Sequence, residues 1–272
     1  MSLHLEYRDP TKIPVEVPGV TPDLLVGMSI PSIERLECFV GNTKVPLADL
    51  FRISGDPADE RLIWAGDLRG VHWIGAGMRS GRMTIDGDAG RHLGSEISGG
   101  DIEVQGSVGD WVGAEMKGGQ IRVHGNAGHL AGSAYRGSRR GMIGGSLMID
   151  GRAGNEIGLS MRRGLIAIGG DAGDLIGMNL LAGTVLVFSQ AGIRHGAGMK
   201  RGTIGLFGES QAPVLPSFRF ACRTRLLALT LILRELERQE FPFPVELLTH
   251  EVTCFSGDFL EGGRGEMWFR SG

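Results

Sequence analysis

Residues 164–173 read GLIAIGGDAG, and a closely related pattern returns at residues 183–192 as GTVLVFSQAG. In each copy a glycine precedes two apolar residues at alternate positions, as Ile166 and Ile168 illustrate. Alternating apolar residues over a short span are typical of a strand with one buried face. The glycines that follow indicate a tight corner, because glycine adopts backbone conformations that other residues avoid. The stretch therefore predicts a strand and a turn that recur along the chain.

The repeat extends through much of the 272-residue chain with a spacing of 19 residues, interrupted by one gap of 26. Its leading glycines are Gly81, Gly100, Gly119, Gly145, Gly164, Gly183 and Gly202. An apolar residue, often methionine, recurs further along each copy, at Ile97, Met116, Tyr135, Met161, Leu180 and Met199. Leu62, Trp64, Gly66 and Met78 fit a weaker, earlier copy.

So short a unit cannot bury its own apolar side chains and must stack on copies of itself. We therefore predict an all-β fold, a right-handed parallel β-helix with about one strand per coil of roughly 19 residues. A left-handed coil is disfavoured because its six-residue period is absent. The β-helix is expected over residues 59–208, after an N-terminal cap at 1–58 and before a C-terminal extension at 209–272.

The C-terminal extension is predicted to contain one amphipathic helix within residues 222–239. Leu226, Leu229, Leu233 and Leu236 recur there at helical spacing, and Leu227, Leu231 and Ile232 widen the apolar stripe. Such a stripe indicates a helix with one side buried. The helix can cap the rod, or can bind the rod on one side and a partner protein on the other.

Composition excludes several classes of function. The net charge of −3 gives no overall attraction to nucleic acid or to an anionic membrane. Long apolar runs are missing, so we expect a soluble protein, and the three dispersed cysteines favour the reducing cytoplasm over a disulfide framework. We predict no metal ligands.

The sequence also offers no recognisable catalytic motif, so no catalytic residue is predicted. Gly75 and Gly196 begin short glycine patterns that resemble dinucleotide fingerprints, but each belongs to the repeat and no helix is expected after it. Asp86, Asp88, Asp150 and Asp171 could supply the paired carboxylates of a polysaccharide-cleaving β-helix. Against this, Asp88 and Asp171 share their repeat position with serine, asparagine, arginine and glutamine.

Basic residues do recur at one position of the repeat, and stacked coils would align them. This basic stripe consists of Arg79, Lys117, Arg136, Arg162 and Lys200, with Arg163 and Arg201 beside two of them. It is either a solvated edge that prevents aggregation or a track for an acidic partner surface or a polyanionic cofactor tail. The seven extra residues of the long gap, near 133–141, carry further arginines and form a second candidate contact site.

Several segments together resemble the C subunits of the formylmethanofuran dehydrogenase family. They include residues 74–90, the stretch RGMIGG at 140–145, MKRGTI at 199–204, LPSF at 215–218 and SGD at 256–258 leading to GGRGE at 262–266. GN at 41–42, followed by LF at 50–51, adds to the likeness. The sequence is most similar to the C (gamma) subunit of the formyltransferase/hydrolase complex of methylotrophic bacteria, and more distantly to the C-terminal β-helical domain of the glutamate synthase large subunit.

The resemblance implies a non-catalytic scaffold subunit in one-carbon oxidation linked to tetrahydromethanopterin and a methanofuran-type carrier. Its partners would be the A, B and D subunits, with the metal and the chemistry in those partners. Three alternatives stay open: the C subunit of a molybdenum or tungsten formylmethanofuran dehydrogenase, a structural β-helix of the glutamate synthase type, and an independent carbohydrate-active β-helix.

Overall fold

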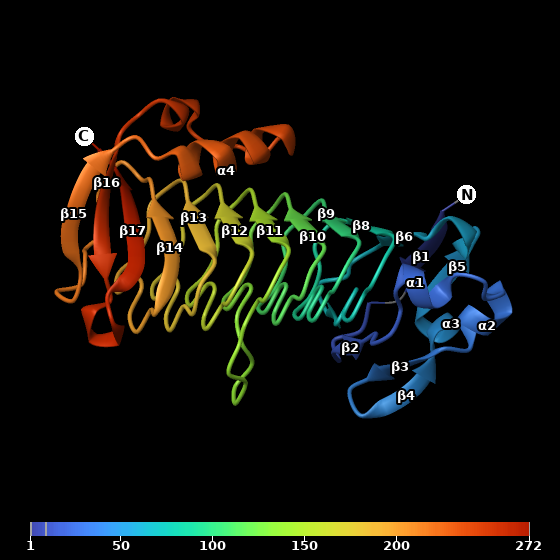
Figure 1. The fold of residues 1–272 in the computed structure, drawn as a ribbon. Coiled ribbons are helices and arrows are strands. Elements are labelled where there is room, and N and C mark those ends of the chain that lie inside the picture. The colour runs from blue at the N-terminus through green and yellow to red at the C-terminus, as the bar shows by residue number, and fades with distance from the viewer. Residues whose placement is uncertain (1, 9, 272) are drawn as a thin grey trace.

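The computed structural model describes residues 2–8 and 10–271, and its central feature is a rod of stacked coils (Figure 1). One strand of each coil pairs in parallel with the same strand of the next. These strands are β6 (Arg61–Ala65), β8 (Arg82–Asp86), β9 (Asp101–Val104), β10 (Gln120–Val123), β11 (Ser146–Ile149), β12 (Leu165–Ile168), β13 (Thr184–Val187) and β14 (Arg201–Leu206). The predicted all-β class and the parallel stacking are confirmed.

Residues at equivalent repeat positions lie directly over one another. Ile166 pairs with Leu147 on one side and with Val185 on the other, and all three side chains are fully buried. Burying such a side chain contributes about 1.5–3 kcal/mol, so the interior ladder stabilises the rod along its length. The corners need glycine for a conformational reason: Gly164 has a φ of +104°, and a Cβ atom there would meet the Gly145 carbonyl oxygen of the preceding coil.

Side chains at two further repeat positions tie each coil to the next. Asp88 Oδ1 accepts the Ser107 amide proton at 2.7 Å, and Ser107 Oγ accepts that of Asn126 at 3.0 Å. In the second ladder, Asn155 Oδ1 accepts the Asp174 amide proton at 3.0 Å, and Asp174 Oδ1 that of Ile193 at 2.9 Å. Aspartate, asparagine and serine can all occupy these positions, because the inter-coil hydrogen bond requires only one side-chain acceptor oxygen.

The N-terminal residues cover one end of the rod. Their elements are β1 (Leu3–Tyr7), β2 (Val15–Glu16), α1 (Pro22–Leu25), α2 (Ile30–Glu34), β3 (Glu37–Val40), β4 (Thr43–Pro46), α3 (Leu47–Leu50), β5 (Phe51–Ser54) and the 3₁₀ turn η1 (Pro57–Asp59). β1 continues the main sheet beside β6, and β5 ends it in antiparallel orientation. β7 (Val71–His72) joins β2, β3 and β4 in a second sheet.

The C-terminal residues cover the opposite end and part of one side. The sheet continues from β14 through β17 (Arg264–Arg270) and β16 (Val252–Gly257) to β15 (Arg219–Thr224). Two 3₁₀ turns, η2 (Val245–Leu248) and η3 (Phe259–Glu261), connect these parts. Helix α4 (Leu227–Arg238) lies along the rod (Figure 1).

The start of that helix differs from the prediction. Residues 219–224, including Cys222, form strand β15 because they pair with β16, and the helix begins only at Leu227. As predicted, Leu229, Leu233 and Leu236 are buried, and they pack on the outward-facing Met148, Ala167 and Leu186 of the sheet. Of the residues that widen the stripe, Leu227 is 73% and Leu231 62% exposed, whereas Ile232 packs against the same cluster.

The insertion also changes one repeat assignment. The repeat spacing predicts Tyr135 in the buried methionine column, but Met142 occupies that position and is fully buried. The seven extra residues therefore leave the coil before this column and return to it at Met142. Figure 1 shows them as a loop that projects away from the rod between β10 and β11.

Candidate functional site

A groove lined with basic side chains crosses the surface beside the C-terminal coils. Two adjoining hollows of about 460 and 410 Å³ share Arg162, Leu181 and Arg201. Their other lining side chains include Arg140, Arg163, Lys200, Glu261 and Arg264. We call this surface the basic groove.

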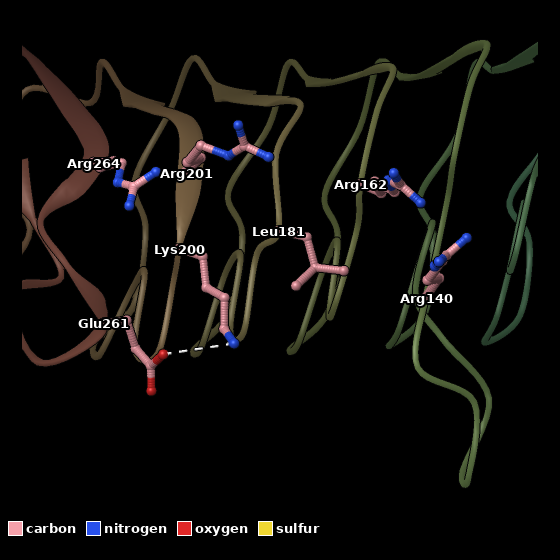
Figure 2. Close-up of a pocket in the computed structure, with 7 residues that line it drawn as sticks. All are labelled: Arg140, Arg162, Leu181, Lys200, Arg201, Glu261 and Arg264. Carbon is pink, nitrogen blue, oxygen red and sulfur yellow. Dashed lines mark ion pairs between the residues drawn. The ribbon is translucent and has the colours of Figure 1, made fainter.

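Four regions of the chain supply the basic side chains of the groove (Figure 2). Arg162 and Arg163 precede β12, whereas Lys200 and Arg201 lie at the start of β14, two coils further on. Arg140 comes from the insertion, and Arg264 is the first residue of β17. Leu181 lies between the two cationic ends, where its apolar side chain forms part of the wall.

The electrostatics of the basic groove favour an anion. Arg201 and Arg264 are direct neighbours in the parallel β14–β17 ladder, an arrangement in which like charges repel. Glu261 is the acidic residue among the lining side chains, and its carboxylate lies 3.7 Å from Lys200 Nζ (Figure 2). A bound polyanion would relieve the remaining repulsion, which gives the groove an energetic reason to bind one.

The structure brings together only part of the predicted basic stripe. Arg162, Arg163, Lys200 and Arg201 all line the groove. Lys117 is not among the lining residues and pairs with Glu96 at 2.8 Å. Arg79 is not among them either, and its backbone amide donates to Asp23 Oδ1 at 3.3 Å.

Arg136 does not belong to the stripe. The amide of Ile143 donates to Met116 O at 2.7 Å, as that of Lys117 donates to Ile97 O in the coil before. Ile143 thus occupies the position assigned to Arg136, because the insertion displaces Arg136 onto the projecting loop. Sequence reasoning placed Arg140 in the insertion but not beside the stripe, and it missed Arg264, since only the pairing of β17 with β14 brings that residue here.

Three of the four aspartates considered as paired carboxylates, Asp88, Asp150 and Asp171, have structural partners. Asp88 and Asp171 accept inter-coil hydrogen bonds, and bonds from Ser189 Oγ and the Gln190 amide lower the pKa of Asp171. The Asp150 carboxylate lies 2.8 Å from both Arg122 Nε and His124 Nδ1. Within residues 2–8 and 10–271, no group of three or more histidine, cysteine, aspartate or glutamate side chains is arranged to hold a metal ion.

An aromatic stack anchors the insertion to the earlier coils. His92 lies between Trp73 and Trp111, with ring centroids 4.3 and 5.3 Å away and nearly parallel planes. Tyr135 covers the stack, and its hydroxyl lies 2.9 Å from His92 Nδ1 and 2.7 Å from Ser95 Oγ. Burial lowers the pKa of His92 to about 4 and raises that of Tyr135 to about 12, so both are neutral at pH 7. Because the ring faces contact one another, we interpret the stack as a structural feature that holds the insertion against the earlier coils.

A charged network holds the C-terminal end of α4 on the sheet. Arg122 donates to the carbonyls of Gln239 and Glu240 at 3.1 and 3.2 Å and to Asp150 Oδ2 at 3.0 Å. His124 continues the network, 2.8 Å from Asp150 Oδ2 and 3.0 Å from Glu103 Oε1.

This network predicts a pH-dependent stability. The hydrogen bond to Glu103, followed by that to Asp150, raises the pKa of His124, and the bond to His124 lowers that of Glu103. The histidine contribution is complete below its unfolded pKa of about 6.5 and is lost as the pH rises through the folded value. The glutamate contribution is present above its unfolded pKa of 4.5 and is lost as the pH falls.

His124→Gln should therefore reduce the free energy of unfolding most between about pH 4.5 and 6.5, by up to about 1 kcal/mol because both groups are partly exposed. Denaturant titrations of both proteins at several pH values measure the difference, which should shrink by pH 8. A difference that grows steadily above pH 7 would contradict the assignment.

Comparisons with known proteins agree with the fold and with the repeat. The family model "GXGXG motif" matches residues 70–241. Over 95 residues the chain is 44% identical to the C subunit of molybdenum-containing formylmethanofuran dehydrogenase 1 of Methanothermobacter thermautotrophicus, a match that covers 35% of this chain and 24% of the relative. The C subunit of tungsten-containing formylmethanofuran dehydrogenase 2 of Methanothermobacter marburgensis is 36% identical over 95 residues, or 34% of this chain and 35% of the relative. The chain thus spans about a quarter to a third of the length of these relatives.

A solved structure matches the whole chain. It is a chain of the formyltransferase/hydrolase complex (FhcABCD) from Methylorubrum extorquens, crystallised with methylofuran, with a TM-score of 0.91 and 30% identity. The superposition covers 99% of the present chain and 100% of that chain. The protein therefore belongs to the GXGXG motif family, in the group that contains the C subunits of formylmethanofuran dehydrogenases. None of the helices among the described residues is long and apolar enough to cross a membrane.

Proposed function

We propose that this chain is a non-catalytic scaffold subunit of a formyltransferase/hydrolase complex and holds the A, B and D subunits together. The observation that carries the proposal is the likeness, over the full length of both chains, to one chain of the Methylorubrum complex. Three of the four carboxylates considered for catalysis, those of Asp88, Asp150 and Asp171, have structural partners instead, which supports a scaffold role. The metal, and the chemistry on the methanofuran-type carrier and tetrahydromethanopterin, would then belong to the partner subunits.

The exposed apolar side of α4 is the surface that we propose for subunit contact. Leu227 and Leu231 are one helical turn apart, and they are 73% and 62% exposed. Apolar side chains grouped on one face of a helix are typical of protein interaction sites. The buried side of the same helix fixes the orientation of this face on the rod.

Co-purification tests the scaffold proposal. We expect Leu231→Glu to abolish co-purification of the A, B and D subunits from a co-expressing strain, because it places a charge in the centre of the contact. Leu24→Glu changes another exposed leucine, at the far end of the rod, and should leave the complex intact. Full assembly of the Leu231→Glu variant, with unchanged thermal stability, would refute the contact at α4.

We further propose that the basic groove guides a polyanionic carrier tail or an acidic partner surface. Arg162→Glu combined with Arg163→Glu should weaken binding of an oligoaspartate peptide by roughly tenfold or more, since each lost carboxylate contact is worth on the order of 1 kcal/mol. Binding should also weaken as salt rises. Arg234→Glu, a charge reversal on the exposed face of α4, is the matched control.

Fluorescence anisotropy of the labelled peptide and isothermal calorimetry with the carrier itself separate the two uses of the groove. Weaker binding of peptide and carrier together supports a carrier track. If the variant binds both normally and also assembles normally, the groove is only a solvated edge.

The proposal also includes the handedness of the coil, the domain boundaries and the cellular location. We infer a right-handed coil, because parallel strands joined by a crossover are almost always connected in that sense. We also retain the division into a cap at 1–58, coils at 59–208 and an extension at 209–272. A cytoplasmic location fits the three free thiols.

A further inference from the structure

Two of the three cysteines lie directly opposite each other at the end of the main sheet. Cys222 of β15 and Cys254 of β16 are partners in the antiparallel register, which is regular from Cys222 to Thr224 after an irregularity at Phe220. Facing residues of antiparallel strands have Cα atoms about 4.5–5.5 Å apart and project from the same face. A disulfide requires a Cα separation of about 4.4–6.8 Å. The backbone is therefore already arranged for a bond between the two sulfur atoms.

The two thiols differ in their surroundings in a way that fixes the order of reaction. Cys222 is exposed on the outermost strand, whereas Cys254 is 6% exposed and packs in the cluster beneath α4. Burial, followed by the neighbouring Cys222, raises the pKa of Cys254 to about 12, so it stays protonated. An oxidant in solution therefore meets Cys222 first.

We propose that Cys222 and Cys254 form a reversible thiol–disulfide site that is oxidised by a small-molecule disulfide of the glutathione class. The Cys222 thiolate attacks one sulfur of the oxidant, forms a mixed disulfide and releases one small thiol. Cys254 then loses its proton and attacks Cys222 Sγ, which displaces the second small thiol. Overall, two protein thiols are oxidised to one disulfide and the oxidant is reduced to two thiols.

The bond would fasten the part of the chain that carries the exposed apolar helix face. Residues 222–254 include all of α4 and η2, so the cross-link closes a loop around both. Closing a loop of this length stabilises a protein chiefly by restricting its unfolded chain. The cross-link does not require the proposed scaffold function, because the strand register and the surroundings of both thiols belong to this chain.

Peptide mapping of the oxidised protein tests the proposal. Full-length Cys38→Ser protein, whose altered residue is buried in the N-terminal region, is incubated with oxidised glutathione, alkylated and digested without reduction. We expect one intrachain link between the peptides of Cys222 and Cys254, and its loss after addition of reduced glutathione. The linked form should also melt higher by about 5 °C or more.

Two further variants, each made in the Cys38→Ser protein, test which cysteine carries out each of the two exchange steps. Cys222→Ser should take up no glutathione, because its remaining thiol is buried. Cys254→Ala should keep a stable glutathione adduct on Cys222, because no second thiol can displace it. A stable adduct on Cys222 in the Cys38→Ser protein, a disulfide between two chains, or unreacted thiols throughout would each overturn the proposal.

Discussion

Gly118→Ala is expected to lower the free energy of unfolding by about 3 kcal/mol, the largest single effect that we predict for a one-carbon change. A Cβ atom at this position would lie 2.4 Å from the carbonyl oxygen of Ser98 in the preceding coil. The obstacle is backbone, which cannot rotate away as a side chain would. Relief requires the two coils to separate, and the hydrogen bond from the Gly118 amide to Ile97 O would weaken with them.

Gly70→Ala is the matched control for this substitution. Its Cβ would meet only the Thr11 carbonyl oxygen, at 3.9 Å, and neither glycine has a backbone conformation that disfavours alanine. Guanidinium denaturation should therefore show little change, or a slight gain from the less flexible unfolded chain. Equal losses in both variants would mean that the coils are not packed backbone against backbone as described.

The second large effect is expected for Arg122→Ala, which should destabilise α4 and its contacts by about 3–5 kcal/mol. The side chain is 11% exposed, pairs with Asp150 and donates to two carbonyls just after the helix. Its guanidinium also lies 5.0 Å from the centre of the Phe241 ring. Removing it leaves a mostly buried Asp150 carboxylate with His124 as its remaining partner.

Hydrogen exchange resolves where that stability is lost. Amides of residues 227–241 should exchange much faster in the variant, whereas those of the interior strands β8 to β10 should keep most of their protection. Arg234→Ala removes an exposed ion pair from the same helix and should change stability by no more than about 0.5 kcal/mol. Combining Arg122→Met with Asp150→Asn should restore part of the loss, because no charge is then left unpaired.

The interior of the rod could be predicted because it depends on local pattern. Ile166, Ile168 and their counterparts keep a fixed distance from glycines, and stacking places like residues over like. The prediction was wrong at Tyr135, because counting residues from Gly119 does not show where the seven extra residues leave the coil. Met142 was the available signal, because a methionine in that column is more typical of the buried position than a tyrosine.

The placement of α4 and of the basic groove depends on contacts between distant segments. The outward positions of three successive strands change from Thr84, Glu103 and Arg122 to Met148, Ala167 and Leu186 in the next three. This loss of polarity is a signal in the sequence that something covers the later coils, although it does not say what. The sequence contains no such signal for Arg264. That residue reaches Arg201 only because β17, more than 50 residues further along the chain, pairs with β14.

The inter-coil ladders have a consequence for how such a protein can change in length. Each interior coil presents to its neighbour the same row of backbone hydrogen-bonding groups and an acceptor side chain in at least one of the two ladders, so a whole 19-residue unit can be duplicated or removed with the same kind of contact at the junction. One unit shifts everything beyond it by about 4.8 Å. The number of coils thereby sets the distance between the N-terminal cap and the C-terminal extension.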